Sequence, residues 1–181
     1  MIDSEILIVD DEPDLAHLFH TWLSASWDVA VAHNGNDALE LISPSTEVVV
    51  LDRRMPGLSG DEVLSRIADR GLLCRVVFVS AAEPDENVVD LTFDEYLVKP
   101  VTRSELVDVV DQLYHWRPED EETWSVQRLI TKKQLLEGHR QRAIDNNRQA
   151  INRVTQQLQE AKGRLGEDRE YDQGLSDLTR A

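Results

Sequence analysis

The sequence predicts an α/β protein, a doubly wound parallel sheet followed by a separate α-helical module. The first observation is that five short apolar runs alternate with helical patterns over residues 1–116. Strands that alternate with helices are typical of a parallel sheet covered on both faces. The second observation is the charge: residues 1–116 hold 7 Lys and Arg against 23 Asp and Glu, whereas residues 117–181 hold 12 of each. Two modules of different character therefore share the chain.

The five apolar runs are short, rich in β-branched residues and bounded by polar residues, as buried parallel strands are. The strands are predicted at residues 5–9, 27–32, 48–51, 75–79 and 95–98.

Helices are predicted between and after these strands, where apolar residues recur with helical spacing. The helices are predicted at residues 15–23, 36–42, 59–68, 86–91 and 102–113. Pro13 suits a first helical turn, because the N–H that proline lacks would be unpaired there. Asn36 or Asp37 is expected to cap the second helix, and Thr102 the last one.

Polar side chains directly follow the first, third, fourth and fifth strands. These residues are Asp10, Asp11, Asp52, Ser80 and Lys99. In open parallel sheets, ligands bind at the carboxyl ends of the strands. We therefore expect these five side chains to converge into one site, although they are spread over 90 positions of sequence.

The composition of this predicted site indicates phosphoryl transfer. Three carboxylates in one place repel one another unless a cation neutralises them. Oxygen ligands without histidine or cysteine suit Mg²⁺. Lys99 adds a positive charge and Ser80 a hydroxyl donor, and both suit a phosphoryl group. Asp52, which follows the central strand, is the expected nucleophile.

These residues resemble the receiver domain of two-component response regulators. The resemblance rests on Asp10-Asp11, on Asp52 followed by Met55-Pro56 and Gly60, on Ser80, and on Lys99-Pro100, and it covers about residues 4–115. It implies a (βα)5 flavodoxin-like fold with strand order 2-1-3-4-5. It also implies a phosphoacceptor in a phosphorelay rather than an enzyme.

The resemblance implies a Mg²⁺ site. Asp11 would ligate the ion directly, and Asp10 would assist, often through water. Asp52 would complete the carboxylate set, and Arg54 would offer its backbone carbonyl.

The resemblance also implies a phosphorylation switch. Asp52 would accept a phosphoryl group from a sensor histidine kinase, and Lys99 would pair with that group. Ser80 would hydrogen-bond it on activation and draw Tyr96 inward. Because the segment between Ser80 and Lys99 is about one turn short for this family, the fourth helix is expected to be short. Arg54 and Ala82 flank the path of the hydrolytic water and are expected to tune phosphoryl lifetime.

The remaining residues divide into an acidic linker at 117–122, a helical output or dimerisation module at 123–165 and a polar tail at 166–181. Two helices are expected in the module, the first ending near Gly138. Apolar residues recur at heptad spacing in the second, at Ile144, Ile151, Leu158 and Leu165, with Asn147, Val154 and Ala161 between them. The pattern predicts a coiled coil or a helical hairpin. The alternative is a long amphipathic helix that packs on the receiver itself.

The sequence alone does not decide which kind of partner this module binds. The segment resembles the HalX domain of haloarchaea in position, length and composition, and that family suggests transcription regulation. Residues 123–165 carry a net charge of +6, from 9 basic and 3 acidic residues, so DNA or the transcription machinery are candidate partners. A homodimer through residues 139–165, or a signalling adaptor that binds proteins and not DNA, are the alternatives. A haloacid-dehalogenase-type phosphatase is disfavoured, because such enzymes need an acid where Arg54 stands.

Composition narrows the class of protein further. The single cysteine, Cys74, rules out an internal disulfide and suggests a small buried side chain. With 41% apolar residues, no long apolar run and no leader pattern, we expect a folded cytoplasmic protein that does not enter the membrane. Only 4 of the 19 basic residues are lysine, and this acidic, lysine-poor composition resembles proteins of salt-loving archaea.

Overall fold

The computed structural model describes residues 5–116, 121–138 and 146–165. Five strands form one sheet: β1 (Ile6–Val9), β2 (Val29–Ala32), β3 (Val48–Leu51), β4 (Arg75–Ser80) and β5 (Glu95–Val98). The helices are α1 (Pro13–Leu23), α2 (Gly35–Leu41), α3 (Gly60–Asp69), the 3₁₀ helix η1 (Glu86–Asp90), α4 (Arg103–His115), α5 (Glu121–Gly138) and α6 (Asn146–Leu165).

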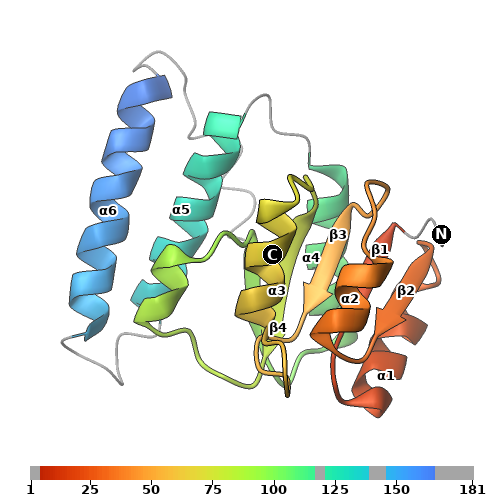
Figure 1. The fold of residues 1–181 in the computed structure, drawn as a ribbon. Coiled ribbons are helices and arrows are strands. Elements are labelled where there is room, and N and C mark those ends of the chain that lie inside the picture. Colours follow the sequence, from red (N-terminus) through yellow and green to blue (C-terminus); the bar gives the residue numbers. More distant parts are fainter. Residues whose placement is uncertain (1–4, 117–120, 139–145, 166–181) are drawn as a thin grey trace.

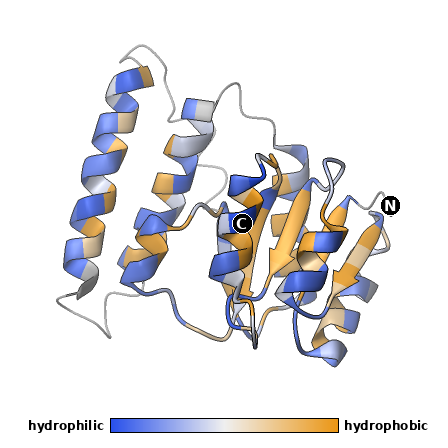
Figure 2. Ribbon diagram, viewed as in Figure 1, coloured by the Kyte–Doolittle hydropathy of each residue, from blue (hydrophilic) through white to orange (hydrophobic). Residues whose placement is uncertain are grey.

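The sheet is parallel throughout, and its strand order is β2-β1-β3-β4-β5, which confirms the predicted fold class. Alternate strand residues point to opposite faces. Leu7 and Val9 contribute to a core under α2 and α3, whereas Ile6 and Ile8 contribute to a core under α1 and α4. Figure 2 shows the strands as the most hydrophobic part of the ribbon. All four residues of β1 and of β3 are buried, as expected of central parallel strands.

Of the two helix caps predicted from the sequence, Thr102 is confirmed and the cap of α2 is corrected. Ser59 and Thr102 each form a capping box, with Glu62 and Glu105. The cap of α2 is Asn34 rather than Asn36 or Asp37, because the Asn34 side chain accepts a hydrogen bond from the Asp37 backbone N–H. The fourth helix is short, as expected, and is the 3₁₀ helix η1.

The C-terminal helices form an intramolecular hairpin that packs against η1 and β5 (Figure 1). α5 begins at Glu121, inside the predicted linker, and residues 117–120 and 166–181 lie outside the described part. The heptad residues of α6 face inward: Ile151 and Val154 join the core under α2 and α3, and Leu158 and Ala161 pack with Val126 of α5.

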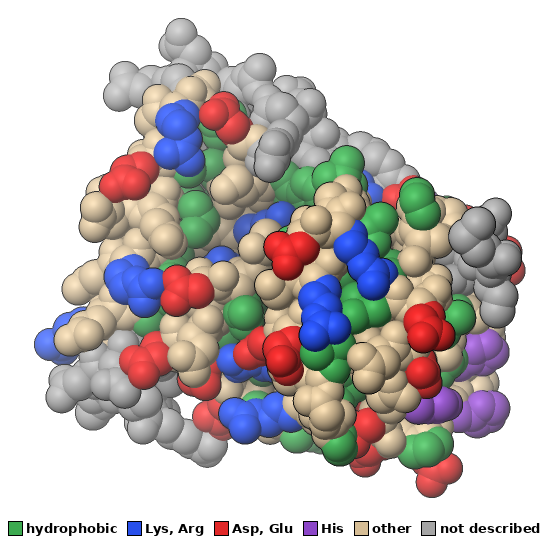
Figure 3. Space-filling view, viewed as in Figure 1, with side chains coloured by type: hydrophobic (Ala, Val, Ile, Leu, Met, Phe, Trp, Pro, Cys, Tyr) green, Lys and Arg blue, Asp and Glu red, His purple; other side chains and the backbone are tan. Residues whose placement is uncertain are grey.

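The hairpin alternative therefore describes these helices better than an extended coiled coil, and they pack on the α/β part of the same chain. Ile144 and the side chain of Asn147 lie outside the described residues, so the predicted polar position in the seam stays a prediction. The other side of α6 is polar, and Figure 3 shows charged side chains on the visible part of this helix. Among the described residues, no helix combines the length and hydropathy needed to cross a membrane.

Candidate functional site

Three carboxylates meet at the carboxyl end of the sheet. Asp10 follows β1, Asp52 follows β3, and Asp11 stands next to Asp10. One carboxylate oxygen from each lies within 4.8 Å of the other two. Asp10 and Asp52 are buried, and Asp11 is partly exposed, so the cluster opens to solvent on one side. The prediction that β1 and β3 bring these residues together agrees with this geometry.

Lys99, at the end of β5, bridges two of these carboxylates. Its Nζ donates to Asp10 Oδ2 at 2.9 Å and to Asp52 Oδ2 at 2.7 Å. Burial, the largest influence, acts to lower the pKa of Lys99, but the hydrogen bonds to Asp52 and Asp10 outweigh it and the pKa is raised. Lys99 is therefore a fixed positive charge. The peptide bond between Lys99 and Pro100 is cis.

One lysine does not neutralise three carboxylates. Burial raises the pKa of Asp10, even though Lys99 and the Glu12 backbone N–H both act to lower it. The donor set consists of oxygen atoms only and leaves about two negative charges to be matched when all three acids are ionised. This donor set fits a hard divalent cation such as Mg²⁺.

Ser80 and Tyr96 form a second group beside the carboxylates, joined through Ala82. Ser80 is fully buried, and its Oγ accepts a hydrogen bond from the Ala82 N–H at 3.3 Å. The Tyr96 hydroxyl donates to the Ala82 carbonyl at 2.6 Å. Tyr96 is 4% exposed and packs against Phe78 and Phe93, so its ring lies inward in this structure.

The segment after Asp52 is held close to α3. The Arg54 backbone N–H donates to Asp52 Oδ1 at 3.0 Å, while the Arg54 side chain is exposed. A side chain at Gly60 would come within 2.7 Å of the Arg53 Cα and would also collide with the Asp52 carbonyl. Gly60 is thus required for the close approach of α3 to the Asp52 segment.

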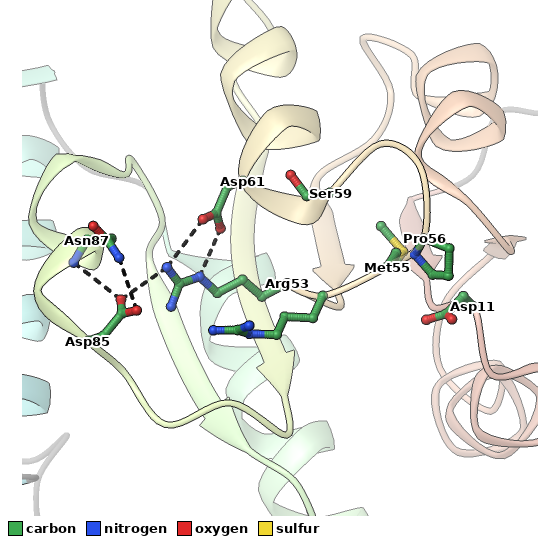
Figure 4. A pocket seen from close by; sticks show the side chains of 9 residues that line it. Asp11, Arg53, Met55, Pro56, Ser59, Asp61, Asp85 and Asn87 are labelled. Carbon is green, nitrogen blue, oxygen red and sulfur yellow. Dashed lines mark hydrogen bonds and ion pairs between the residues drawn. The ribbon is translucent and has the colours of Figure 1, made fainter. Parts of the chain in front are cut away.

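Arg53 is a buried residue of the site that the sequence did not reveal. Its side chain is 5% exposed and pairs with Asp61 on α3, at 2.9 and 3.2 Å, and with Asp85 before η1, at 3.2 Å (Figure 4). These residues line one side of a cavity of about 620 Å³, and Asp11 lies on the other side. Two adjacent arginines gave no signal that one was buried and the other exposed.

A second buried carboxylate, Asp94, anchors α5 to the sheet and was also missed. Its oxygens accept from the Val76 N–H at 2.7 Å, from Trp124 Nε1 at 2.5 Å and from Arg128 Nε at 2.8 Å. The Arg128 guanidinium also lies 4.0 Å from the centroid of the Trp124 ring. A run such as Thr92-Phe93-Asp94 does not reveal partners 30 or more residues away.

Lys132 of α5 is buried in the same contact. Its Nζ donates to the Val89 carbonyl of η1 at 2.8 Å and lies 5.9 Å from the centroid of the Phe93 ring. Burial lowers the pKa of Lys132 to about 8, and the nearby charge of Arg128 acts in the same direction. Arg153 of α6 adds an exposed ion pair with Asp90, at 2.6 Å. Cys74, as expected, is a buried thiol, and burial raises its pKa to about 12.

Known proteins similar to this chain are signalling and regulatory proteins. A Haloferax volcanii protein named "Putative transcriptional regulator" is 46% identical over 109 residues, which are 60% of this chain and 19% of that protein. The transcriptional regulatory protein TrcR of Mycobacterium tuberculosis is 36% identical over 56% of this chain and 42% of its own length. The sensor histidine kinase TmoS of Ectopseudomonas mendocina is 32% identical over 56% of this chain and 11% of its own length. The chain spans less than half the length of each of these relatives.

Solved structures agree with the fold. The response regulator TrrA of Thermotoga maritima, in complex with Mg²⁺-BeF, is 32% identical, with a TM-score of 0.52 over 60% of this chain and 96% of that one. The receiver domain of the Francisella response regulator 1452 is 28% identical, with a TM-score of 0.55 over 61% of this chain and 96% of that one. The family model described as the response regulator receiver domain matches residues 6–111. Through this segment, which carries the carboxylate cluster and Lys99, the chain belongs to the response regulator receiver domain family.

Proposed function

We propose that the protein is a response regulator in which Asp52 accepts a phosphoryl group from a sensor histidine kinase. The observation that carries this proposal is the arrangement around Asp52: a buried carboxylate held 2.7 Å from Lys99, inside a cluster of three acids. One oxygen of Asp52 is engaged by Lys99, and the other accepts from the Arg54 N–H. These contacts orient the carboxylate for attack.

In the proposed step, an Asp52 carboxylate oxygen attacks the phosphorus of a phosphohistidine. The P–N bond breaks, its electron pair returns to the imidazole nitrogen, and Asp52 becomes an acyl phosphate. Lys99 neutralises charge on the phosphoryl oxygens, and the Ser80 hydroxyl donates a hydrogen bond to them.

Asp10, Asp11 and Asp52 are the residues that would hold Mg²⁺, together with the Arg54 carbonyl. A divalent cation there supplies positive charge to the phosphoryl oxygens as they approach three carboxylates. The TrrA response regulator, solved in complex with Mg²⁺-BeF, supports this assignment for the family. Asp10 would assist the cation indirectly, because both of its oxygens already accept hydrogen bonds. Its Oδ1 accepts from the Glu12 N–H and its Oδ2 accepts from Lys99.

We further propose that phosphorylation alters the docking of the hairpin α5–α6. Tyr96 contacts both Ala82 and Phe93, and Phe93 lies beside Lys132 of α5. The next residue, Asp94, binds Trp124 and Arg128. A movement of Ser80 and Tyr96 would therefore be transmitted to the hairpin through Phe93 and Asp94.

The proposed output is transcriptional, through DNA or a transcription protein, with α5–α6 as a HalX-like module in a cytoplasmic haloarchaeal protein. The names of the Haloferax and Mycobacterium relatives support this output. The alternative is an adaptor that binds proteins only. The structure is compatible with both: α6 exposes Arg148 and Lys162, but it also uses Arg153 to pair with Asp90. Because the inward residues of α6 are covered within the chain, a dimer through residues 139–165 would need the hairpin to open or its polar side to pair.

The first test is phosphorylation by acetyl phosphate with Mg²⁺, followed by intact-mass measurement. We expect the wild type to gain one phosphoryl group that hydroxylamine removes, and Asp52→Asn to gain none. Asp14→Asn, an exposed acid-to-amide change on α1, is the matched control and should behave as wild type. Equal labelling of Asp52→Asn and wild type would refute the assignment of Asp52.

The output is tested by crosslinking to DNA in the native host, comparing wild type with Asp52→Asn. Discrete enriched promoter sites that the variant loses are expected of a phosphorylation-dependent regulator. Absence of enrichment from both proteins would support the adaptor instead.

A further inference from the structure

Arg53 occupies an unusual position, because it directly follows the proposed phosphoacceptor and is almost fully buried. Its guanidinium forms a two-point ion pair with Asp61 and a third contact with Asp85. Figure 4 shows the side chain extending from the segment after β3 toward these two acids, away from Asp11. Arg53 therefore connects three elements: the end of β3, the start of α3 and the loop of residues 81–85 that follows β4.

The loop of residues 81–85 is held from two sides. At its beginning, Ala82 is bound by Ser80 and by the Tyr96 hydroxyl. At its end, Asp85 is bound by Arg53. Arg53 also acts on Tyr96: burial raises the pKa of Tyr96, and the Arg53 guanidinium partly offsets this increase. Arg53 thus supports both the loop and the ring that contacts it.

Stability alone is a weak reason for this arrangement. A buried ion pair is often no more stabilising than apolar residues of the same size. The position of Arg53, between the phosphoacceptor and the loop after Ser80, offers another reason.

We propose that Arg53 is a positioning residue for phosphoryl transfer at Asp52. By tying Asp85 to α3 and supporting Tyr96, it holds the loop of residues 81–85 so that the Ser80 hydroxyl and the loop N–H groups face the phosphoryl group. The proposal rests on the proposed function of Asp52. It assigns to Arg53 a role different from that of Lys99, since the guanidinium is directed toward Asp61 and Asp85 and not toward the carboxylate cluster.

The experiment compares four single-substitution variants and one double variant of the full chain at saturating Mg²⁺. Arg53→Met removes the guanidinium. Arg53→Lys keeps the charge but cannot span both acids. Asp85→Asn removes the negative charge from the loop contact, and its amide oxygen can still accept the Asn87 N–H that caps η1. Glu86→Gln, an exposed acid-to-amide change in the next position, is the matched control.

The rate of phosphorylation by acetyl phosphate is the main readout. We expect Arg53→Met to slow it about tenfold, within the range that small misplacements of reacting groups produce. Arg53→Lys and Asp85→Asn should each show most of this slowing, because each weakens the charged contact between Arg53 and the loop. The double variant Arg53→Met/Asp85→Asn should be slower than Arg53→Met by less than about twofold, since the effects of substitutions at residues in contact are not additive. Glu86→Gln should match the wild type.

A second readout separates positioning from simple destabilisation. The sequence has three tyrosines, so fluorotyrosine labelling with ¹⁹F NMR resolves Tyr96, identified with Tyr96→Phe. We expect the Tyr96 signal to move toward the solvent-exposed value in Arg53→Met and Asp85→Asn, at temperatures where both remain folded, and to stay in place in Glu86→Gln.

Unchanged rates in Arg53→Met and Asp85→Asn, with a labelled wild type, would overturn the role of Arg53 and leave that of Asp52 intact. Loss of rate in strict proportion to loss of folded protein, with an unmoved Tyr96 signal, would also overturn it. A wild type that takes up no phosphoryl group would instead refute the proposed function on which the inference rests.

Discussion

The molecule contains two buried acidic centres that lie at opposite ends of the parallel strands and are built in opposite ways. At the phosphoacceptor centre, three carboxylates lie together and one lysine, Lys99, pairs with two of them. At the docking centre, the single carboxylate of Asp94 is surrounded by donors from β4 and α5: a backbone N–H, an indole and a guanidinium. The first centre has an excess of negative charge, and the second has none.

This difference distinguishes a site whose charge needs a bound ligand from a contact whose charges are already paired within the chain. Buried charges are tolerated when they are paired and hydrogen-bonded. Asp94 meets that condition within the chain, so its role is to hold α5. The cluster of Asp10, Asp11 and Asp52 does not meet it among the described residues, which is the physical argument for a cation there. Burial of acidic residues alone would not have distinguished the two.

The largest effect is expected from breaking the docking centre. Asp94→Ala leaves the buried Trp124 indole and the Arg128 guanidinium without their acceptor. Loss of one partner from a buried pair typically costs about 3–5 kcal/mol. Urea unfolding should show a decrease of this order in the free energy of unfolding, and hydrogen exchange should show early opening of α5 and α6.

The matched control is Asp90→Ala, which removes an exposed ion pair with Arg153. Exposed pairs contribute about 0–1 kcal/mol, so this variant should remain close to the wild type. Equal destabilisation by the two substitutions would contradict the distinction between a saturated buried contact and a surface pair.

The second prediction concerns Lys132, the unfavourable charge of the docking centre. Its pKa is lowered to about 8 in the folded protein, while the unfolded value is near 10.5. Between these values the unfolded chain binds more protons, so stability rises with pH, by up to about 3 kcal/mol. Below pH 8 the buried charge destabilises the fold and this contribution is absent.

Lys132→Met should remove this rise in stability between pH 8 and 10.5 and should be neutral or stabilising at pH 7. Urea unfolding of the variant and the wild type at pH 7 and pH 9.5 measures both effects. Lys133→Met, a change at the neighbouring partly exposed lysine, is the control. A wild type with the same pH dependence as Lys132→Met would count against a buried charged Lys132.

The third prediction concerns Mg²⁺ binding at the phosphoacceptor centre. Mg²⁺ should stabilise the folded protein, because the folded carboxylate cluster binds it and the unfolded chain does not. At one hundred times the dissociation constant, the gain is about 2.7 kcal/mol. Thermal unfolding with and without Mg²⁺ should show the increase in wild type and Asp14→Asn, and a much smaller one in Asp11→Asn. A full increase in Asp11→Asn would place the ion elsewhere.

The smallest effect is expected from a substitution that lies outside both centres, and it serves as a reference for the larger effects. Thr102 caps α4 through a capping box with Glu105. Thr102→Ala should reduce the free energy of unfolding by about 1 kcal/mol and should leave Mg²⁺ stabilisation and phosphorylation unchanged. A large loss of phosphorylation in this variant would show that the start of α4 also positions Lys99.

The sequence predicts the α/β part well, because its signals are local. Continuous apolar runs mark β1 and β3, and the polar residues that end them mark the site, since parallel strands bring their carboxyl ends to one edge. The capping residue Thr102 is similarly readable from a few neighbouring positions. The prediction of Asn36 or Asp37 as the cap of α2 is wrong because Asn34 and these residues are all good caps within one turn.

The docking centre and the Arg53 contacts could not be predicted, because both depend on pairs that are distant in sequence. Arg53 reaches Asp85 across 32 positions, and Trp124 reaches Asp94 across 30. The heptad pattern of α6 indicates an apolar seam, but such a seam fits a partner chain as well as α5 or η1. Only the three-dimensional structure shows that α5 and η1 cover it.

The hydrophobic core under α2 and α3 runs without a break from Leu7 on β1 to Val154 on α6. The segment that defines the family ends at residue 111, well before this core does. The segment that matches the family is therefore smaller than the part of the chain that shares this core. A chain cut after α4 would expose the apolar side of η1 and leave Asp94 without α5, so we expect residues 121–165 to unfold together with the receiver in one cooperative transition.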